Sequence, residues 1–230
     1  MITRLAEHLW LLPYPLKKLG ADLRRNVTLL RLGSGEIVIH STGPFTDDDV
    51  KAIHALGHPG WLVEGMLAHD TFAKEGRAAF PDIPYFAPPG FTEETGIATS
   101  TLDQCPASWG TDLQVQKVEG VPTYQEYVFY HALSRTLVVC DLVFNFGDHE
   151  PLWTELLLRV AIGSEHGPGM SRPFKAAVKD EDAFKKSLDA IFAWDFDRVI
   201  VGHGDVIETG GKAKIRSALE VAGLPAPESV

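Results

Sequence analysis

Two groups of apolar strands, each followed by helices, constrain the fold of this chain more than any other feature of its sequence. Apolar runs bounded by turn residues predict the first group at residues 9–14, 26–32 and 37–40. Short turns separate the second group, predicted as an antiparallel meander at residues 113–118, 124–131 and 136–140. Helices are predicted after the first group at 47–56 and 71–80, and after the second at 151–162, 173–179, 181–194 and 212–222. Two separate groups of strands, each followed by helices, favour a fold of two sheets, each covered by helices.

The composition indicates an ordinary globular protein. Of the 230 residues, 45% are hydrophobic and 23% are charged, which is enough apolar material for a sizeable core, and we expect one domain over residues 1–230. A formal net charge of −10 argues against a surface that neutralises phosphates or binds anionic lipid. We therefore expect neither a nucleic-acid partner nor a membrane partner.

The lack of a recognisable targeting signal and the pattern of cysteines predict a soluble, cytoplasmic protein. The N-terminal residues lack the long apolar segment of a secretory signal, and no run approaches the ~18 apolar residues of a membrane span. Cys105 and Cys140 have neither CxxC spacing nor the density of a disulfide scaffold. Both are expected to be free thiols in a reducing compartment.

Three potential metal ligands lie at or just beyond the ends of apolar strands. The run Val199-Ile200-Val201 ends at Gly202-His203-Gly204, where the two glycines let the backbone turn tightly and present the imidazole. Asp141 directly follows the strand at 136–140, and His69 lies beyond another short apolar run. Layered α/β folds hold ligands and metals at such strand ends. The alternatives are a helix or loop cap for Asp141 and a hydrogen-bonded structural role for His203.

These stretches carry a resemblance to a known family. Thr136-Leu137-Val138-Val139-Cys140-Asp141 resembles the strand of the metallo-β-lactamase superfamily that ends in a metal-bridging aspartate. Val201-Gly202-His203-Gly204-Asp205 is similar to the last histidine motif of that superfamily, and residues 27–43 are similar to its first hairpin. The resemblance implies a four-layer αββα sandwich with two mixed sheets flanked by helices.

One motif of the superfamily is altered in this chain. The place of its HxHxDH signature is taken by Gly65-Met66-Leu67-Ala68-His69-Asp70, so Gly65 and Leu67 stand where two histidine ligands would be. The chain is similar to a divergent branch of uncharacterised proteins within the superfamily, expected to be metal-dependent hydrolases. That branch usually carries two adjacent histidines where this chain has His69-Asp70, so Asp70 is a departure even there.

The resemblance implies a ligand set of His69, His131, Asp141 and His203. Three nitrogens and one oxygen suit a single Zn²⁺ ion, with Fe²⁺ or Mn²⁺ as alternatives. Asp70 is the candidate general base or the residue that orients a ligand. The alternative for Asp70 is the N-cap of the helix that follows, and the alternative for His131 is a surface histidine at a strand end.

The favoured function is a metal-dependent hydrolase in which a metal-activated water attacks a small ester, lactone, amide or phosphoester. We expect a small-molecule substrate and allow for a homodimer. The alternative is a non-catalytic or metal-poor protein of the same fold that acts in binding or as a scaffold, because the HxHxDH histidines are missing. Redox chemistry at a non-haem iron has no positive support, and the absence of a GxSxG motif argues against a serine hydrolase.

Overall fold

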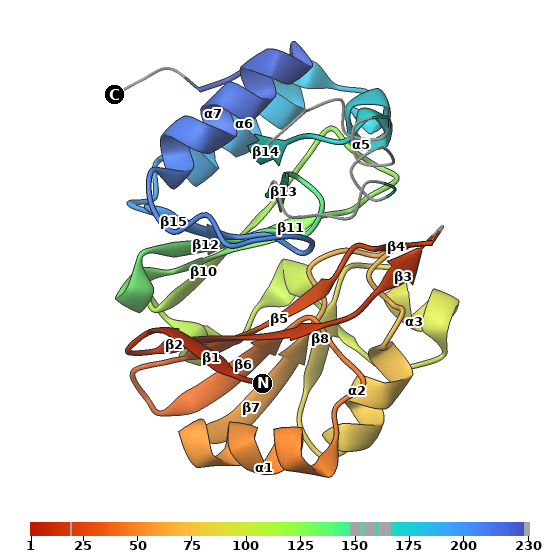
Figure 1. The fold of residues 1–230 in the computed structure, drawn as a ribbon, viewed down its shortest axis with the longest axis vertical. Helices are drawn as coiled ribbons and strands as arrows, with labels where there is room; N and C mark the ends of the chain where they lie inside the picture. Colours follow the sequence, from red (N-terminus) through yellow and green to blue (C-terminus); the bar gives the residue numbers. More distant parts are fainter. Residues whose placement is uncertain (19, 148–152, 154–159, 161–166, 228–230) are drawn as a thin grey trace.

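The computed structural model describes residues 1–18, 20–147, 153, 160 and 167–227. The helix predicted at 151–162 therefore lies almost entirely outside the described residues. Within them, helices and sheets are stacked in four layers, with the two sheets facing each other in the middle (Figure 1). The prediction of an αββα sandwich with two mixed sheets is confirmed.

The larger sheet has seven strands in the order β1-β2-β5-β6-β7-β8-β9. Neighbours are antiparallel from β1 to β6 and parallel from β6 to β9, which makes the sheet mixed. The strands are β1 (Thr3–Ala6), β2 (Leu9–Tyr14), β5 (Arg25–Arg31), β6 (Glu36–His40), β7 (His58–Val63), β8 (Tyr85–Ala87) and β9 (Ser100–Thr101). A short hairpin of β3 (Lys17–Lys18) and β4 (Ala21–Asp22) extends from this part of the chain.

The smaller sheet has four strands in the order β10-β11-β12-β15. The predicted meander forms β10 (Leu113–Lys117), β11 (Tyr127–His131) and β12 (Thr136–Val138), and β15 (Arg198–Ile200) joins β12 in parallel. Strand β12 ends earlier than predicted because the backbone N–H groups of Cys140 and Asp141 turn to a buried carboxylate, Glu126, instead of a neighbouring strand. A separate pair of strands, β13 (Phe144–Phe146) and β14 (Gly167–Gly169), follows.

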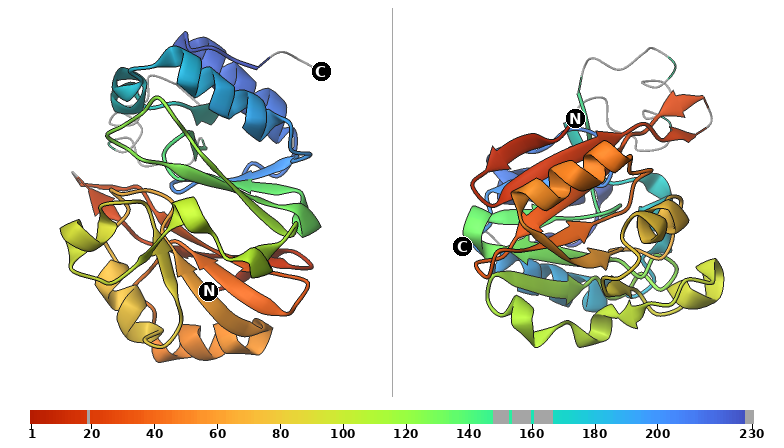
Figure 2. Two further views of the ribbon diagram at one scale, coloured as in Figure 1. Left: turned by 180° about the vertical axis from the view of Figure 1, so that it is seen from behind. Right: turned by 90° about the horizontal axis from the view of Figure 1, so that it is seen from below.

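Helices cover the outer face of each sheet. The larger sheet is covered by α1 (Asp47–Leu56), α2 (Ala73–Ala79) and α3 (Phe91–Thr95), and the smaller one by α5 (Arg172–Ala177), α6 (Glu181–Phe192) and α7 (Gly211–Ala222) (Figures 1 and 2). Single-turn 3₁₀ helices lie at Leu102–Gln104, Ala107–Trp109 and Ala132–Ser134. Helix α1 has the bounds that the sequence predicts, because Thr46 and Asp49 form a reciprocal capping box at its start.

Three apolar clusters fill the spaces between the four layers. Residues such as Leu30, Val38, Phe129 and Ile200 form the cluster between the two sheets. The other two clusters lie between the larger sheet and α1 to α3, and between the smaller sheet and α5 to α7. Because the central cluster draws on both sheets, its packing fixes how the strand ends of one sheet face those of the other.

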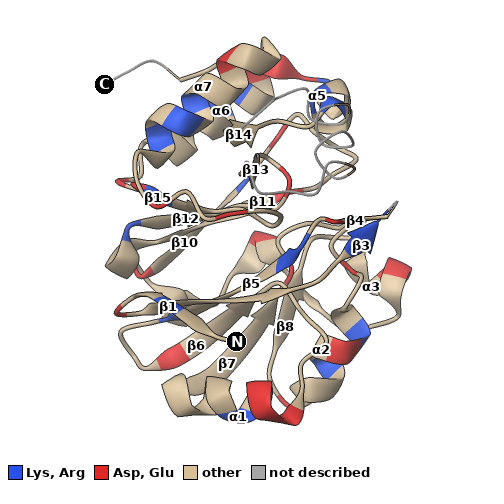
Figure 3. Ribbon diagram, in the orientation of Figure 1, with Lys and Arg blue, Asp and Glu red and all other residues tan. Residues whose placement is uncertain are grey.

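Charge is distributed over both halves of the described chain. Figure 3 shows Lys and Arg on helices and strand ends of both sheets, interspersed with Asp and Glu. Among the described residues, the longest apolar helical stretch falls short of what a membrane crossing needs.

Candidate metal centre

His203 lies in a tight loop after β15, held against the start of β5. Its Nδ1 atom is 2.5 Å from the carbonyl oxygen of Arg24. A carbonyl can only accept a hydrogen bond, so Nδ1 carries the hydrogen and the lone pair of His203 is on Nε2. Burial lowers the pKa of His203 to about 4, against the opposing effect of the Asp141 carboxylate, and so keeps the imidazole neutral. This is the form of histidine that binds metals.

Asp141 lies beside His203 because β12 and β15 are parallel and in register. Val138 pairs with Ile200, and the backbone N–H of Gly202 donates to the carbonyl of Cys140, so the two strands end at the same edge of the sheet. One oxygen of Asp141, Oδ1, lies 3.6 Å from His203 Nε2. Burial raises the pKa of Asp141, while His203 and Arg25 act in the opposite direction.

His69 completes the cluster from the larger sheet. It follows β7, is 2% exposed, and places Nε2 3.2 Å from Oδ1 of Asp141. Its ring also lies edge-on to that of His203, with centroids 5.1 Å apart. Position 202 has space only for glycine, because a Cβ atom there would lie 2.8 Å from Cε1 of His69. Burial, together with the charge of Arg25, lowers the pKa of His69 well below its usual range.

The donor atoms of this centre fit a divalent metal ion. One atom each from His69, Asp141 and His203 lies within 4.8 Å of the other two. The Nε2 lone pair of His203 lies 3.6 Å from a carboxylate oxygen of Asp141, so a cation bound between the two atoms would be coordinated by both. Two imidazole nitrogens and one carboxylate oxygen suit zinc or iron.

His131 does not join this cluster, so the predicted set of four metal ligands is reduced to three. In the antiparallel pair of β11 and β12, His131 pairs with Thr136, at the end of β12 opposite to Asp141. Its Nδ1 contacts the Ser134 hydroxyl at 2.7 Å and its Nε2 contacts the carbonyl of Arg31 at 3.2 Å. Both ring nitrogens are therefore occupied, and His131 is a buried structural histidine.

Asp70 also lies outside the cluster of three. Its side chain is exposed and lines a shallow surface hollow with Thr71, Lys74 and Glu94. The alternative role as a helix cap is wrong as well, because α2 begins at Ala73 and its N-cap residue, Phe72, makes no side-chain hydrogen bond to the helix. A role for Asp70 as general base stays a prediction without geometric support.

Gly65 stands where the superfamily motif has its first histidine, and the surrounding space is filled. A Cβ atom on Gly65 would lie 2.8 Å from His40 Nε2, 2.9 Å from Cys140 Sγ and 3.0 Å from the carbonyl oxygen of Tyr127. A residue larger than glycine at position 65 would therefore need space that the side chains of His40 and Cys140 occupy.

Three buried charged residues near the centre were missed by the sequence interpretation. Glu126 accepts the backbone N–H groups of Cys140 and Asp141, and burial with the nearby Asp141 raises its pKa to about 8. Glu64 accepts from Thr42 and Tyr85, and burial raises its pKa to about 7. Arg25 is 1% exposed. Each is a charged residue adjoining an apolar strand, the same signal that identified Asp141.

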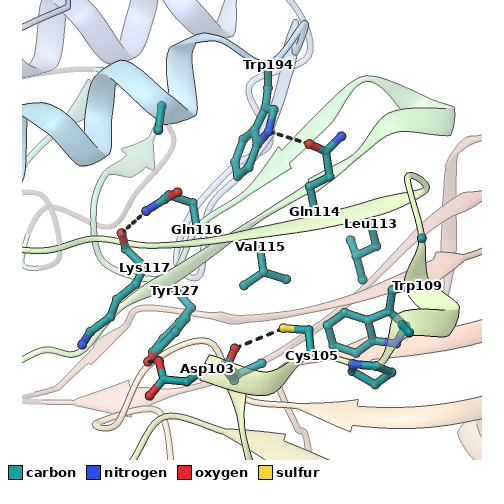
Figure 4. Close-up of a pocket in the computed structure, with 15 residues that line it drawn as sticks. Asp103, Cys105, Trp109, Leu113, Gln114, Val115, Gln116, Lys117, Tyr127 and Trp194 are labelled. Atoms are coloured by element: carbon teal, nitrogen blue, oxygen red, sulfur yellow. Dashed lines mark hydrogen bonds between the residues drawn. The ribbon is translucent and has the colours of Figure 1, made fainter.

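A separate groove runs along the edge strand β10. Its volume is about 670 Å³, and Asp103, Cys105, Trp109 and Trp194 are among its lining residues (Figure 4). Burial raises the pKa of the Cys105 thiol to about 11, so the thiol is not activated as a nucleophile. None of the three metal-centre residues lines this groove.

The chain matches no protein-family model, and a search of curated proteins finds no match. Solved structures do match it over nearly its whole length. They include DIM-1 metallo-β-lactamase, with a TM-score of 0.66 and 15% identity over 97% of this chain and 96% of that one. A metallo-β-lactamase from Erythrobacter litoralis gives 0.63 and 19% over 96% and 95%. FIM-1 from Pseudomonas aeruginosa, in its mono-zinc form, gives 0.62 and 14% over 98% and 96%. At these identities the likeness is one of fold.

Proposed function

We propose that this chain, which has the metallo-β-lactamase fold, is a metal-dependent hydrolase acting on a small ester, lactone, amide or phosphoester. The observation that carries the proposal is the cluster of His69, Asp141 and His203 at the facing ends of the two sheets. A fold alone does not determine a reaction, whereas the donor atoms and their surroundings limit the chemistry that the centre can perform.

The metal would be held by Nε2 of His69, a carboxylate oxygen of Asp141 and Nε2 of His203. We propose a single ion, zinc in preference to iron or manganese, because three ligands come together and His131 does not. A bound divalent ion supplies two effects in such a centre, a lower pKa for a coordinated water and polarisation of a carbonyl or phosphoryl oxygen.

Other residues of the chain orient the ligands. The carbonyl of Arg24 holds the His203 ring in one tautomer, and the carboxylate of Glu126 holds the backbone N–H of Asp141 at 3.1 Å. Partners of this kind fix the direction of a ligand and increase metal affinity. Burial of His69 and His203 keeps both imidazoles neutral, so protons do not compete with the metal near neutral pH.

The second candidate is a binding or scaffold protein on the same fold. It is favoured by Gly65 and Leu67, which offer no coordinating side chain at two motif positions. We further propose, as extensions of the sequence interpretation, one domain over residues 1–230, a cytoplasmic location and a small-molecule substrate. In the same way we propose that the chain can form a homodimer and that it binds neither nucleic acid nor membranes.

Metal analysis separates the two candidates. Protein purified without chelators is analysed by elemental mass spectrometry, next to Asp141→Ala and the control His131→Ala. The hydrolase proposal expects one equivalent of metal in the wild-type protein and the control, its loss in Asp141→Ala, and metal-dependent cleavage of ester, lactone or phosphoester substrates. Absence of metal, with no uptake and no activity on adding Zn²⁺, Fe²⁺ or Mn²⁺, would refute it.

If His69→Ala and His203→Ala change neither metal content nor activity but lower stability, the scaffold function is supported instead. The two substitutions report on different elements, since His69 follows a strand of the larger sheet and His203 a strand of the smaller one. A concerted loss of metal in both variants therefore requires that the two sheets share one site.

A further inference from the structure

Arg24, directly before β5, has a backbone conformation that side chains disfavour. Its φ angle is 56°, in the left-handed region that residues with a Cβ atom rarely adopt. Both of its backbone polar groups are engaged: its N–H donates to Oδ1 of Asp22 at 3.0 Å, and its carbonyl accepts the Nδ1 hydrogen of His203. The direction of that carbonyl, and with it the contact to a proposed metal ligand, therefore depends on a strained conformation.

The side chain of Arg24 is anchored to the same part of the protein that its carbonyl contacts. Its Nη1 donates to Oδ1 of Asp205 at 2.7 Å, and its Cζ atom lies 5.6 Å from the centroid of the Phe146 ring. A charge-assisted hydrogen bond and a cation–π contact together favour one position of the guanidinium. Since Asp205 follows His203 by two residues, Arg24 holds the His203 loop through its backbone and through its side chain.

Asp205 is itself fixed in place, although its side chain is half exposed. Its Oδ2 atom accepts the backbone N–H of Gly147 at 3.2 Å, while Oδ1 accepts from Arg24. Asn145 fixes its backbone: the Asn145 carbonyl accepts the N–H of Asp205 at 2.5 Å, and the Asn145 amide donates to the carbonyl of Asp205 at 2.9 Å. The carboxylate therefore offers the guanidinium a partner whose position does not depend on Arg24.

A neighbouring residue, Asn26, fixes the distance between β5 and the His203 loop. It donates three hydrogen bonds to backbone carbonyls of residues 201–204, at 2.9 to 3.0 Å. These contacts do not involve the His203 ring. What Arg24 adds is the direction of one carbonyl, which decides whether the ring nitrogen Nδ1 has an acceptor.

We propose that Arg24 is a positioning residue of the metal centre, and that its ion pair with Asp205 holds its backbone in the conformation that fixes the tautomer of His203. The inference rests on the proposed metal site and deepens it. If the Arg24 carbonyl turns away, the single hydrogen of the neutral imidazole moves from Nδ1 to Nε2, where the Asp141 carboxylate, 3.6 Å away, accepts it. In that form Nε2 has no lone pair for a metal ion.

NMR of the ring nitrogens tests the proposal in metal-free protein with isotope-labelled histidine, because it reports the tautomer directly. The His203 signals are those missing from His203→Gln. We expect the hydrogen on Nδ1 in the wild type and a shift to the Nε2–H form in Arg24→Ala and Asp205→Ala. Zinc affinity, measured by chelator competition, should fall at least about tenfold in both variants. Arg24→Lys keeps a cation for Asp205 and should keep the wild-type tautomer.

Arg135→Ala is the matched control. Arg135 also has a left-handed backbone, with a φ angle of 49°, and also pairs with an exposed aspartate, Asp195, at 2.9 Å. It directly precedes β12, at the end of that strand opposite to Asp141. Arg135→Ala should lower the stability to urea about as much as Arg24→Ala does, and leave the His203 tautomer and the zinc affinity unchanged.

The proposal is overturned if the wild type carries the hydrogen on Nε2, if folded Arg24→Ala or folded Asp205→Ala keeps the wild-type tautomer, or if Arg135→Ala changes it as much. A lower zinc affinity with an unchanged tautomer overturns it as well. Should Arg24→Ala not fold, Asp205→Ala decides by the same criteria, because it removes an exposed side chain. Failure of the metal site gives a different result: the wild type then binds no zinc, while the spectra of metal-free protein still decide the role of Arg24.

Discussion

The imidazole of His203 donates its Nδ1 hydrogen to the carbonyl oxygen of Arg24, 2.5 Å away. The two residues are 179 positions apart in the sequence, and the contact joins the loop after β15 to the start of β5. It fixes which nitrogen of His203 is free and directs that nitrogen at Asp141. One hydrogen bond between the two sheets thereby sets both the tautomer and the orientation of the proposed metal ligand His203.

Replacing Asp141 by Asn should strongly weaken metal binding with little change in fold. Asparagine has the same shape but no charge, and it offers a poorer oxygen ligand to a transition metal. We expect at least about a hundredfold loss of zinc affinity, measured by chelator competition. His54→Ala, at an exposed histidine on α1, is the matched control and should keep wild-type affinity. Equal zinc affinity in Asp141→Asn and wild type would contradict the assignment.

Replacing His131 by Ala should lower stability and leave metal content unchanged. The substitution removes the partner of Ser134 and of the Arg31 carbonyl from a buried position and leaves a cavity. The expected cost is about 2–4 kcal/mol of unfolding free energy, measured by urea denaturation. Loss of metal from a folded His131→Ala protein would restore this residue to the ligand set.

Replacing Gly65 by Ala should destabilise the protein through crowding. The new methyl group would meet His40, Cys140 and the Tyr127 carbonyl at 2.8 to 3.0 Å. We expect a cost of about 1–3 kcal/mol, measured by thermal and urea unfolding. Gly60→Ala is the control, because its nearest neighbour is 3.4 Å away. Equal stability of the two variants would contradict the close packing around position 65.

Glu64 should make the protein less stable as the pH rises from about 4.5 to 7. Its pKa in the folded protein is about 7, above the ordinary value of 4.5, so the folded state binds more protons across this interval. Glu64→Gln should therefore match wild type near pH 4.5 and exceed it by up to about 3 kcal/mol above pH 7.

The amide oxygen of Glu64→Gln can keep the three hydrogen bonds that Oε1 of Glu64 accepts from Thr42 and Tyr85. Urea unfolding of metal-free wild type and Glu64→Gln at several pH values is the measurement. A constant difference between the two proteins across the pH range would show that Glu64 does not titrate as its burial implies.

Much of the fold follows from local sequence. Helix α1 begins after Thr46 because a capping box needs only residues 46 to 49, and the strands of the meander follow from their apolar runs and short turns. Asp141 and His203 were predicted as ligands because each stands at or just beyond the end of an apolar run, and parallel pairing of β12 and β15 brings those two ends together.

The apolar pattern of the chain is therefore enough to predict two sheets covered by helices, with His69, Asp141 and His203 at or just beyond the ends of strands. The packing of the sheets shows that His69, Asp141 and His203 of the predicted ligand set meet, that His131 lies at the opposite end of the sheet, and that Glu126 holds the backbone N–H groups of Cys140 and Asp141. Local propensity acts over a few residues, whereas the contacts of Glu126 with Cys140, of His69 with Asp141 and of His131 with Arg31 join residues 14, 72 and 100 positions apart. They arise when the central core packs and brings the ends of strands from different sheets together.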